Sequence, residues 1–271
     1  GCFTGGLSCN KVIAPVFFME YIIIILVAFG ASMLTFFSGF GLGTMLTPVF
    51  ILFFPPEFAV AATAIVHFLN NIFKLILVGK HAVKYVILSF GLPAIVGAYF
   101  GAMALGKLAN SDTVLHLGPI ETNFLNLVMA LLIFAFSLME LLPRLKNIDI
   151  NKKFLIPGGI MSGFFGGLSG HQGALRSAFL VKLGLNKSQF VASGVVIACL
   201  VDTIRISTYA VSFDFAVLEG SLGLIGLATL SAFAGAFIGK RMLEKITISF
   251  IQNLVGILMI LISILLFLGV I

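Results

Sequence analysis

The stretch "FFSGFGLGTMLTP", residues 36–48, interrupts two strongly apolar runs, and a similar stretch, "FFGGLSGHQGALRSAF" at 164–179, follows in the second half of the chain. Glycine lets the backbone turn sharply and approach other groups closely. Because one kind of break occurs twice, we expect two related halves, each with a helical hairpin that turns at its glycine loop.

The composition places the chain in a membrane. Of its 271 residues, 60% are hydrophobic and only 10% are charged, whereas soluble domains carry about 25% charged residues. Continuous apolar runs such as "FIQNLVGILMILISILLFLGVI" at 250–271 reach the roughly 20 residues that a helix needs to cross a bilayer. A β-barrel would instead show short alternating segments. The chain is therefore predicted to be an all-α polytopic membrane protein.

The hydropathy pattern predicts two short hairpin pieces and three longer helices in each half. The first half has apolar segments at 17–38, 44–54, 57–79, 84–106 and 122–142, and the second at 154–169, 173–184, 187–211, 216–239 and 247–270. The domain plan is a polar N-terminal stretch (1–17), a first repeat (18–142), a basic linker (143–153) and a second repeat (154–271).

Local matches between the halves support an internal duplication. "FAVAATAIVHFLNNIFK" at 58–74 resembles "FVASGVVIACLVDTIR" at 190–205, with Lys74 opposite Arg205. In the same order, "GAYFGAMALGK" at 97–107 resembles "GAFIGKRMLEK" at 235–245. The latter pair contains the G-x-x-x-G motif, which lets membrane helices approach closely.

The positions of Lys and Arg predict that the second half is inverted. If each glycine loop turns the chain back, one side of the membrane collects eleven basic residues: Lys80, Lys84, Arg144, Lys146, Lys152, Lys153, Lys182, Lys187, Lys240, Arg241 and Lys245. The other side holds only Lys11 and Lys107. If each hairpin passes straight through instead, the split is seven against six. Basic residues gather in cytoplasmic loops, so we expect an inverted repeat in the bacterial cytoplasmic (inner) membrane with both termini outside.

The second glycine loop carries the first candidate for anion binding. Arg176 falls in the first turn of the piece that begins near Gly173. A helix N-terminus offers free N–H groups and a partial positive charge, and arginine adds a planar fork that suits oxoanions. The loop offers further donors and close backbone approach through Ser169, Gly170, His171, Gln172 and Ser177. Alternatively, Arg176 only ties the hairpin to a helix carbonyl or to Asp202.

The first loop is uncharged. Its candidate residues are Ser38, Gly41, Gly43 and Thr44. They either line a ligand cavity or form a turn in which small residues allow helices to pack closely.

Polar residues form a stripe on the 57–79 helix. His67, Asn70, Asn71 and Lys74 are spaced i, i+3, i+4 and i+7, which places them on one face. Such a stripe in an apolar helix usually faces the bundle interior or a water-filled cavity. Lys74 could instead snorkel to the interface, and His67 could transfer protons or be a packing residue.

Asp202 and Arg205 are spaced i, i+3 on the 187–211 helix and can pair. Asp202 could alternatively carry a proton during transport. The basic residues inside the predicted spans, Lys74, Arg176 and Arg205, outnumber this acid and favour an anionic substrate.

Enzyme signatures are missing from the sequence. It has no H-x-x-x-H, C-x-x-C, G-x-S-x-G or G-x-x-x-x-G-K-[ST] motif, so we expect no enzyme activity, no cofactor, no metal site and no nucleic-acid partner. Without an ATP-binding segment, uphill transport would use a proton or sodium gradient or a partner protein. The expected partners are a small anion, the lipid bilayer and a second copy of the chain in a homodimer.

The glycine loops resemble those of the sulfite exporter TauE/SafE family. The first half reads "SGFGLGTMLTPVF" and then "AVAATAIV", and the second reads "SGFFGGLSGHQGALRSAFLVKLGL" and then "FVASGVVIA". In place of the triple-glycine core that the resemblance implies, this chain has "GLG" and "GHQG". The resemblance implies transport of sulfur-containing anions such as sulfite, thiosulfate or organosulfonates. We therefore predict a secondary transporter that works by alternating access, with a channel-like or accessory membrane subunit as the alternative.

Overall fold

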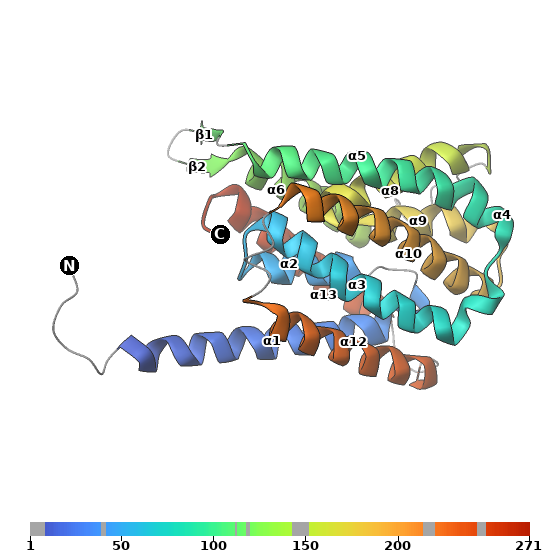
Figure 1. Cartoon of the computed structure of the whole chain (residues 1–271), viewed down its shortest axis with the longest axis horizontal. Coiled ribbons are helices and arrows are strands. Elements are labelled where there is room, and N and C mark those ends of the chain that lie inside the picture. The colour runs from blue at the N-terminus through green and yellow to red at the C-terminus, as the bar shows by residue number, and fades with distance from the viewer. Residues whose placement is uncertain are drawn as a thin grey trace.

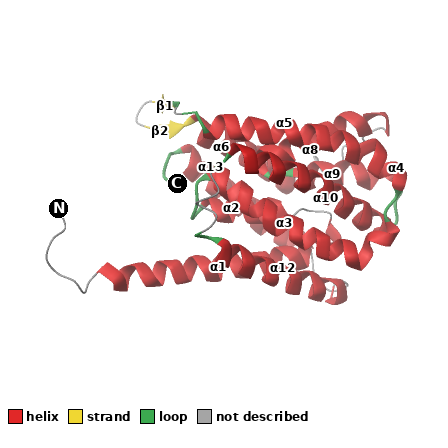
Figure 2. Ribbon diagram, in the orientation of Figure 1, coloured by secondary structure: helices red, strands yellow, loops and turns green. Residues whose placement is uncertain are grey.

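The protein is a bundle of long helices lying side by side (Figure 1). This computed structural model describes residues 9–38, 42–111, 113–117, 120–142, 152–213, 220–242 and 248–271. Helices dominate, and two short strands form the β-structure of the described part (Figure 2). The described part of the chain begins and ends at the same end of the bundle (Figure 1).

The first half contains the expected hairpin pieces and three longer helices. They are α1 (Cys9–Ser38), α2 (Leu42–Ile51), α3 (Pro56–Val78), a 3-10 turn (Gly79–His81), α4 (Lys84–Val86), a π turn (Ile87–Gly91), α5 (Leu92–Ala109), β1 (Val114–Leu117), β2 (Ile120–Asn123) and α6 (Phe124–Leu141).

The second half repeats this order of helices. They are a 3-10 turn (Lys152–Phe154), α8 (Leu155–Ser169), α9 (Gln172–Leu180), a second 3-10 turn (Val181–Leu183), α10 (Lys187–Ser212), α12 (Leu222–Met242) and α13 (Ile248–Phe267). Each of the ten predicted helical segments therefore has a helix in the structure. Most of the basic linker, 143–151, lies outside the described residues.

Three details differ from the sequence prediction. Helix α1 begins at Cys9, earlier than expected, because hydropathy marks the membrane layer whereas backbone hydrogen bonding continues beyond it. The antiparallel hairpin β1–β2, in which Val114 pairs with Asn123, was not expected because strands of four residues give little hydropathy signal. The 84–106 segment contains a π turn just before Pro93, where proline lacks the N–H that a regular helix would use.

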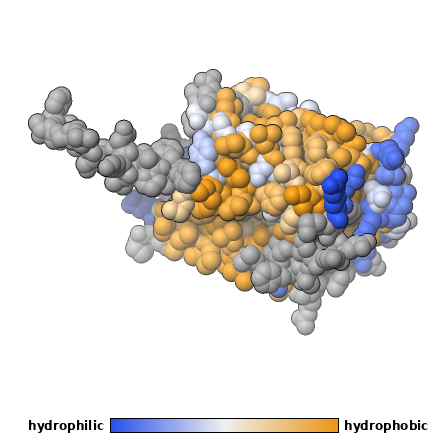
Figure 3. All heavy atoms as spheres, turned by 90° about the horizontal axis from the view of Figure 1, so that it is seen from below, coloured by the Kyte–Doolittle hydropathy of each residue, from blue (hydrophilic) through white to orange (hydrophobic). Residues whose placement is uncertain are grey.

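The described surface has the character of a membrane protein. Five helical segments are long and apolar enough to cross a membrane: Pro56–His81, Lys84–Ala109, Phe124–Leu141, Lys187–Ser212 and Leu222–Arg241. Hydrophobic residues cover most of the described part of the face in Figure 3, and hydrophilic residues gather at its right-hand end. The prediction of a polytopic helical membrane protein is confirmed.

Helices of one half pack on helices of the other. Helix α5 packs on α8, α1 on α12, α3 on α10 and α6 on α13. Glycine makes the first two contacts very close: a Cβ at Gly97 would lie 2.0 Å from the carbonyl oxygen of Ile160, and one at Gly235 would lie 2.2 Å from that of Phe29. Both predicted G-x-x-x-G motifs, which begin at these two glycines, therefore lie where backbones touch, as expected.

The return pieces of the hairpins are short. Helix α2 has 10 residues and α9 has 9, so each is about 15 Å long or less at the usual rise per residue. This is about half of the hydrocarbon core of a bilayer. Each hairpin therefore turns inside the bundle, well short of a full second crossing.

Candidate functional site

The tips of the two hairpins meet inside the bundle. A Cβ at Gly43, in the first turn of α2, would lie 3.0 Å from the carbonyl oxygen of Gly170, which ends α8. Gly170 has a φ of 81°, which favours glycine, and a Cβ there would lie 2.9 Å from Oγ1 of Thr47. Gly43 therefore leaves room for the backbone of the other hairpin, and Gly170 allows the left-handed turn at its tip.

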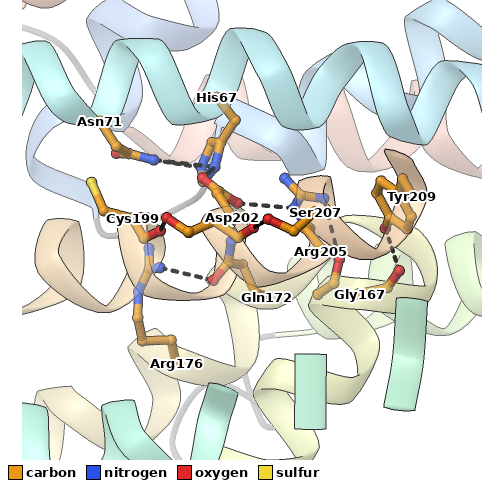
Figure 4. A network of polar contacts seen from close by, with 12 residues as sticks. His67, Asn71, Gly167, Gln172, Arg176, Cys199, Asp202, Arg205, Ser207 and Tyr209 are labelled. Atoms are coloured by element: carbon orange, nitrogen blue, oxygen red, sulfur yellow. Dashed lines mark hydrogen bonds and ion pairs between the residues drawn. The ribbon is translucent and has the colours of Figure 1, made fainter. Parts of the chain in front are cut away.

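A buried carboxylate, Asp202 on α10, lies beside this junction and is held from both halves of the chain (Figure 4). Its Oδ2 is 2.6 Å from Nδ1 of His67 on α3. Its Oδ1 accepts hydrogen bonds from Nε2 of Gln172 (3.0 Å) and Nε of Arg205 (2.9 Å). The predicted pairing of Asp202 with Arg205 is confirmed, and both side chains are 0% exposed.

Arg205 reaches from α10 to the tip of the second hairpin. Its Nη1 donates to the carbonyl oxygen of Gly166 (3.2 Å) and lies 3.5 Å from the Cβ position of Gly170. One turn later, Tyr209 donates its hydroxyl to the carbonyl oxygen of Gly167. These contacts hold the guanidinium rigidly, while its Nη2 is buried without a hydrogen-bond partner among the described residues.

More polar atoms at the junction are buried without a protein partner in the described chain. They are Nε2 of His171 and the hydroxyls of Thr44, Thr47 and Thr63. Thr44 and His171 follow the two contacting glycines directly, and a Cβ at Gly43 would lie 3.7 Å from Cγ2 of Thr63. Each unsatisfied buried polar group costs about 1–3 kcal/mol. Their concentration at one junction, together with Nη2 of Arg205, is the pattern of a polar ligand site.

Arg176 lies behind Gln172 when viewed from Asp202 (Figure 4). Its Nη1 donates to Oε1 of Gln172 (3.5 Å), and Gln172 in turn bonds Asp202. The side chain is 6% exposed, and a Cβ at Gly194 would lie 3.5 Å from its Nε. The expected tie between Arg176 and Asp202 therefore runs through an amide.

The remaining residues of the second loop build its turn. Nδ1 of His171 is 2.8 Å from the carbonyl oxygen of Ser169, and the ring stacks on Phe136 with centroids 5.1 Å apart. Ser162 donates to the carbonyl oxygen of Gln172 (3.0 Å). Gly173 and Ser177 are buried on the first turns of α9.

The predicted polar stripe of α3 faces the bundle interior. His67, Asn70, Asn71 and Lys74 are all 5% exposed or less, so Lys74 does not snorkel to the interface. Its Nζ is 3.5 Å from Oγ1 of Thr35 on α1. With the amide of Asn70 oriented to satisfy its neighbours, its oxygen accepts from Lys74 (3.3 Å) and its nitrogen donates to the carbonyl of Ala232 (3.3 Å).

The residues of the stripe therefore take part in two separate sets of contacts. His67 and Asn71 belong to the Asp202 network, since Nδ2 of Asn71 lies 3.1 and 3.2 Å from the two ring nitrogens of His67. Asn70 and Lys74 instead face α1 and α12. The side chain of Ser38, and Gly41 as a whole, lie outside the described residues.

Sequence reasoning missed Thr47, Thr63 and Tyr209. Thr63 precedes His67 by four residues and extends the polar stripe by one turn, and Thr47 follows Thr44 by three, so helical spacing could have identified both. Tyr209 gave no such signal, because its role depends on a carbonyl in another helix. Among the described residues, no group of three or more His, Cys, Asp or Glu is placed to hold a metal ion.

Comparison with known proteins agrees with this architecture. The family model described as "Sulfite exporter TauE/SafE" matches residues 24–266, which include both glycine loops and the five candidate spans. No curated protein and no solved structure matches the chain. A match over nearly the whole length shows the family: the chain belongs to the sulfite exporter TauE/SafE family of membrane transporters.

Proposed function

We propose that this protein is a secondary transporter of small sulfur-containing anions, such as sulfite, thiosulfate or an organosulfonate, that works by alternating access. The observation that carries the proposal is the junction of the hairpin tips, where Nη2 of Arg205 and three threonine hydroxyls are buried without a hydrogen-bond partner in the described part of the chain. These groups are hydrogen-bond donors, and an oxoanion offers several acceptor oxygens and a compensating charge.

The substrate would bind between the two tips. Gly43 and Gly170 supply the close backbone approach, Thr44, Thr47 and Thr63 supply hydroxyls from the first half, and Arg205 supplies the charge from the second. Arg176 and Lys74 lie further from the junction on the contacts described above, and we assign them to the path of the anion. Gln172 acts as a support, since both ends of its amide are engaged by Arg176 and Asp202.

We further propose that the halves are inverted repeats. The packing of the helices between the halves supports this. If each helix is replaced by its counterpart in the other half, the contact of α1 with α12 becomes the observed contact of α8 with α5. The contacts of α3 with α10 and of α6 with α13 are unchanged by the exchange. A two-fold relation of this kind brings the hairpin tips together at its axis. Transporters with inverted repeats commonly place substrate at such breaks and switch sides by exchanging the conformations of the halves.

The proposed orientation places both termini and the β1–β2 hairpin outside and the Lys84 turn in the cytoplasm. In a variant free of native cysteines, Glu121→Cys should react with a membrane-impermeant maleimide added to intact cells. Lys84→Cys should react only after permeabilisation, because the basic loops stay inside. Both positions are exposed, so the reagent can reach each of them, and the reverse labelling pattern would show the opposite orientation.

Transport is tested with purified protein in liposomes. Radiolabelled sulfite, thiosulfate and taurine are presented separately. At least one should enter with saturable kinetics and at a rate higher than its rate of entry into protein-free liposomes. The same anion should raise the melting temperature, because a ligand that binds the folded state stabilises it. Flux that never saturates would indicate a channel-like protein, and absence of both binding and flux would indicate an accessory subunit.

A further inference from the structure

We infer that Asp202 is an exchangeable counter-ion for Arg205: a bound anion takes over the charge of the guanidinium, and the Asp202–His67 pair then takes up one proton, so that proton and anion cross together. The inference rests on the proposed function and deepens it by naming the coupling ion and the residues that carry it. It follows from how the buried charges share partners.

The carboxylate and the proposed substrate compete for one cation. Asp202 Oδ1 accepts from Nε of Arg205, while Nη2 of the same guanidinium is the atom left for a ligand at the tips. Both side chains are 0% exposed, so solvent cannot screen a second negative charge. An anion that joins Asp202 at Arg205 therefore leaves one buried negative charge uncompensated, which a proton would remove.

His67 gives that proton a place beside the carboxylate. Nδ2 of Asn71 lies 3.1 Å from Nδ1 and 3.2 Å from Nε2 of His67. Oδ2 of the ionised Asp202 lies 2.6 Å from Nδ1 and can only accept, so the neutral ring carries its hydrogen on Nδ1, and Nε2 is the ring nitrogen that can accept from the amide of Asn71. A further proton on Nε2 requires only that the amide of Asn71 turn to present its oxygen.

The charge balance then closes for a monoanion. Before binding, neutral His67 and ionised Asp202 together carry one negative charge, which Arg205 compensates. After binding, the imidazolium and the carboxylate compensate each other, and Arg205 compensates the substrate. No bond of the His67–Asp202 pair has to break, and the proton returns to water when the anion leaves.

The other charged groups around Asp202 do not replace His67 in this role. From α9, Arg176 reaches Asp202 through Gln172. Helix α3 also carries Lys74, which faces Thr35 of α1. Residues 155–169 of α8 contain no titratable side chain.

Further titratable side chains on the neighbouring elements are exposed or half-buried. Those that are exposed are Tyr99 and Lys107 of α5 and Lys80 and His81 of the turn after α3, and Glu20 of α1 is half-buried. His67 is the titratable group on a neighbouring helix that the described contacts place directly on the carboxylate.

The pairing also joins the two halves. His67 belongs to α3 and Asp202 to α10, 135 positions apart in the sequence. Any rearrangement that moves α3 relative to α10 changes the surroundings of the shared proton. Binding of an anion at the hairpin tips and protonation of the His67–Asp202 pair are thus linked through the interface of α3 with α10.

The test measures protons and anions together. Liposomes containing the full chain and an internal pH dye receive radiolabelled methanesulfonate or thiosulfate, neither of which titrates near neutral pH. For wild type we expect internal acidification of about one proton per methanesulfonate. Uptake should be faster when the outside is more acidic, because the proton then enters down its gradient and drives the anion that is coupled to it. Asp202→Asn should bring the protons per anion in the remaining flux close to zero.

Two further variants complete the design. Ser207→Ala lies on the exposed face of α10 and should keep the wild-type ratio. His67→Gln retains a hydrogen-bonding side chain without a titratable ring and should also lower the ratio, which keeps the test valid if Asp202→Asn does not fold.

The outcomes separate the inference from the proposed function. Wild-type flux without protons, or an unchanged ratio in a folded Asp202→Asn or His67→Gln variant, would overturn the counter-ion exchange while leaving the transporter intact. If no anion binds or moves, the proposed function itself fails, and the inference fails with it.

Discussion

Replacing Arg205 with glutamine is expected to weaken anion binding by about 100-fold or more. The guanidinium supplies the charge of the proposed site, and its Nη2 is buried with no hydrogen-bond partner among the residues that the structure describes. A hydrogen bond to a charged group contributes about 1.5–3 kcal/mol, which corresponds to roughly 10- to 150-fold in affinity, and loss of the buried charge adds to this. The measurement is the anion-induced rise in melting temperature, or calorimetric titration with the transported anion.

Two companion variants separate binding from stability. Arg205→Gln alone leaves Asp202 without its cation, which should cost about 3–5 kcal/mol of folding free energy. The double variant Asp202→Asn/Arg205→Gln removes both charges and should recover much of that stability, yet it should still bind anions weakly. If the double variant regains wild-type affinity, Arg205 does not hold the substrate and only stabilises the fold.

Gly163→Ala is expected to be among the most destabilising substitutions in the chain. The added Cβ would lie 1.9 Å from the carbonyl oxygen of Ala94. Because that oxygen belongs to the backbone of a long helix, it cannot move away by a change of rotamer as a side-chain atom can. Helices α5 and α8 would have to separate along their contact, with a loss of about 3 kcal/mol, at the upper end of what overpacked sites usually cost. Thermal unfolding in detergent, together with the yield of monodisperse protein, measures the effect.

Gly226→Ala provides the matched control. It makes the same substitution within helix α12, and a Cβ there meets nothing within 4 Å. Because alanine is a better helix former than glycine by about 1 kcal/mol, this variant should be as stable as wild type or slightly more so. Equal melting temperatures for the two variants would contradict the close backbone contact of α5 with α8.

Local spacing along the chain predicted much of the candidate site. The i, i+3 spacing of Asp202 and Arg205 anticipated their ion pair, and the stripe from His67 to Lys74 anticipated a buried polar face. Both relations lie within one helix, where the geometry of the turn sets which side chains are neighbours. The two glycine loops similarly indicated that the helical chain is interrupted twice, since glycine widens the backbone conformations that are open at its own position.

The contacts between segments could not be derived in this way. Neither the bond from His67 to Asp202 nor the contact of Gly43 with Gly170 follows from any spacing along the chain. For the same reason, spacing alone makes Arg176 the first candidate for anion binding, and it does not show that Arg205 reaches Gly166 and Gly170 at the tips whereas Arg176 contacts Gln172.

The membrane environment, the helices, the two breaks and the residues that share a helical face therefore follow from the sequence, because they depend on hydropathy and on interactions within a few residues. Which faces meet depends on the tertiary fold. A helix carries several small and polar residues around its circumference, and the packing of its neighbours selects which of them become buried together. That selection brings Asp202, His67, Gln172 and Arg205 together beside the hairpin tips.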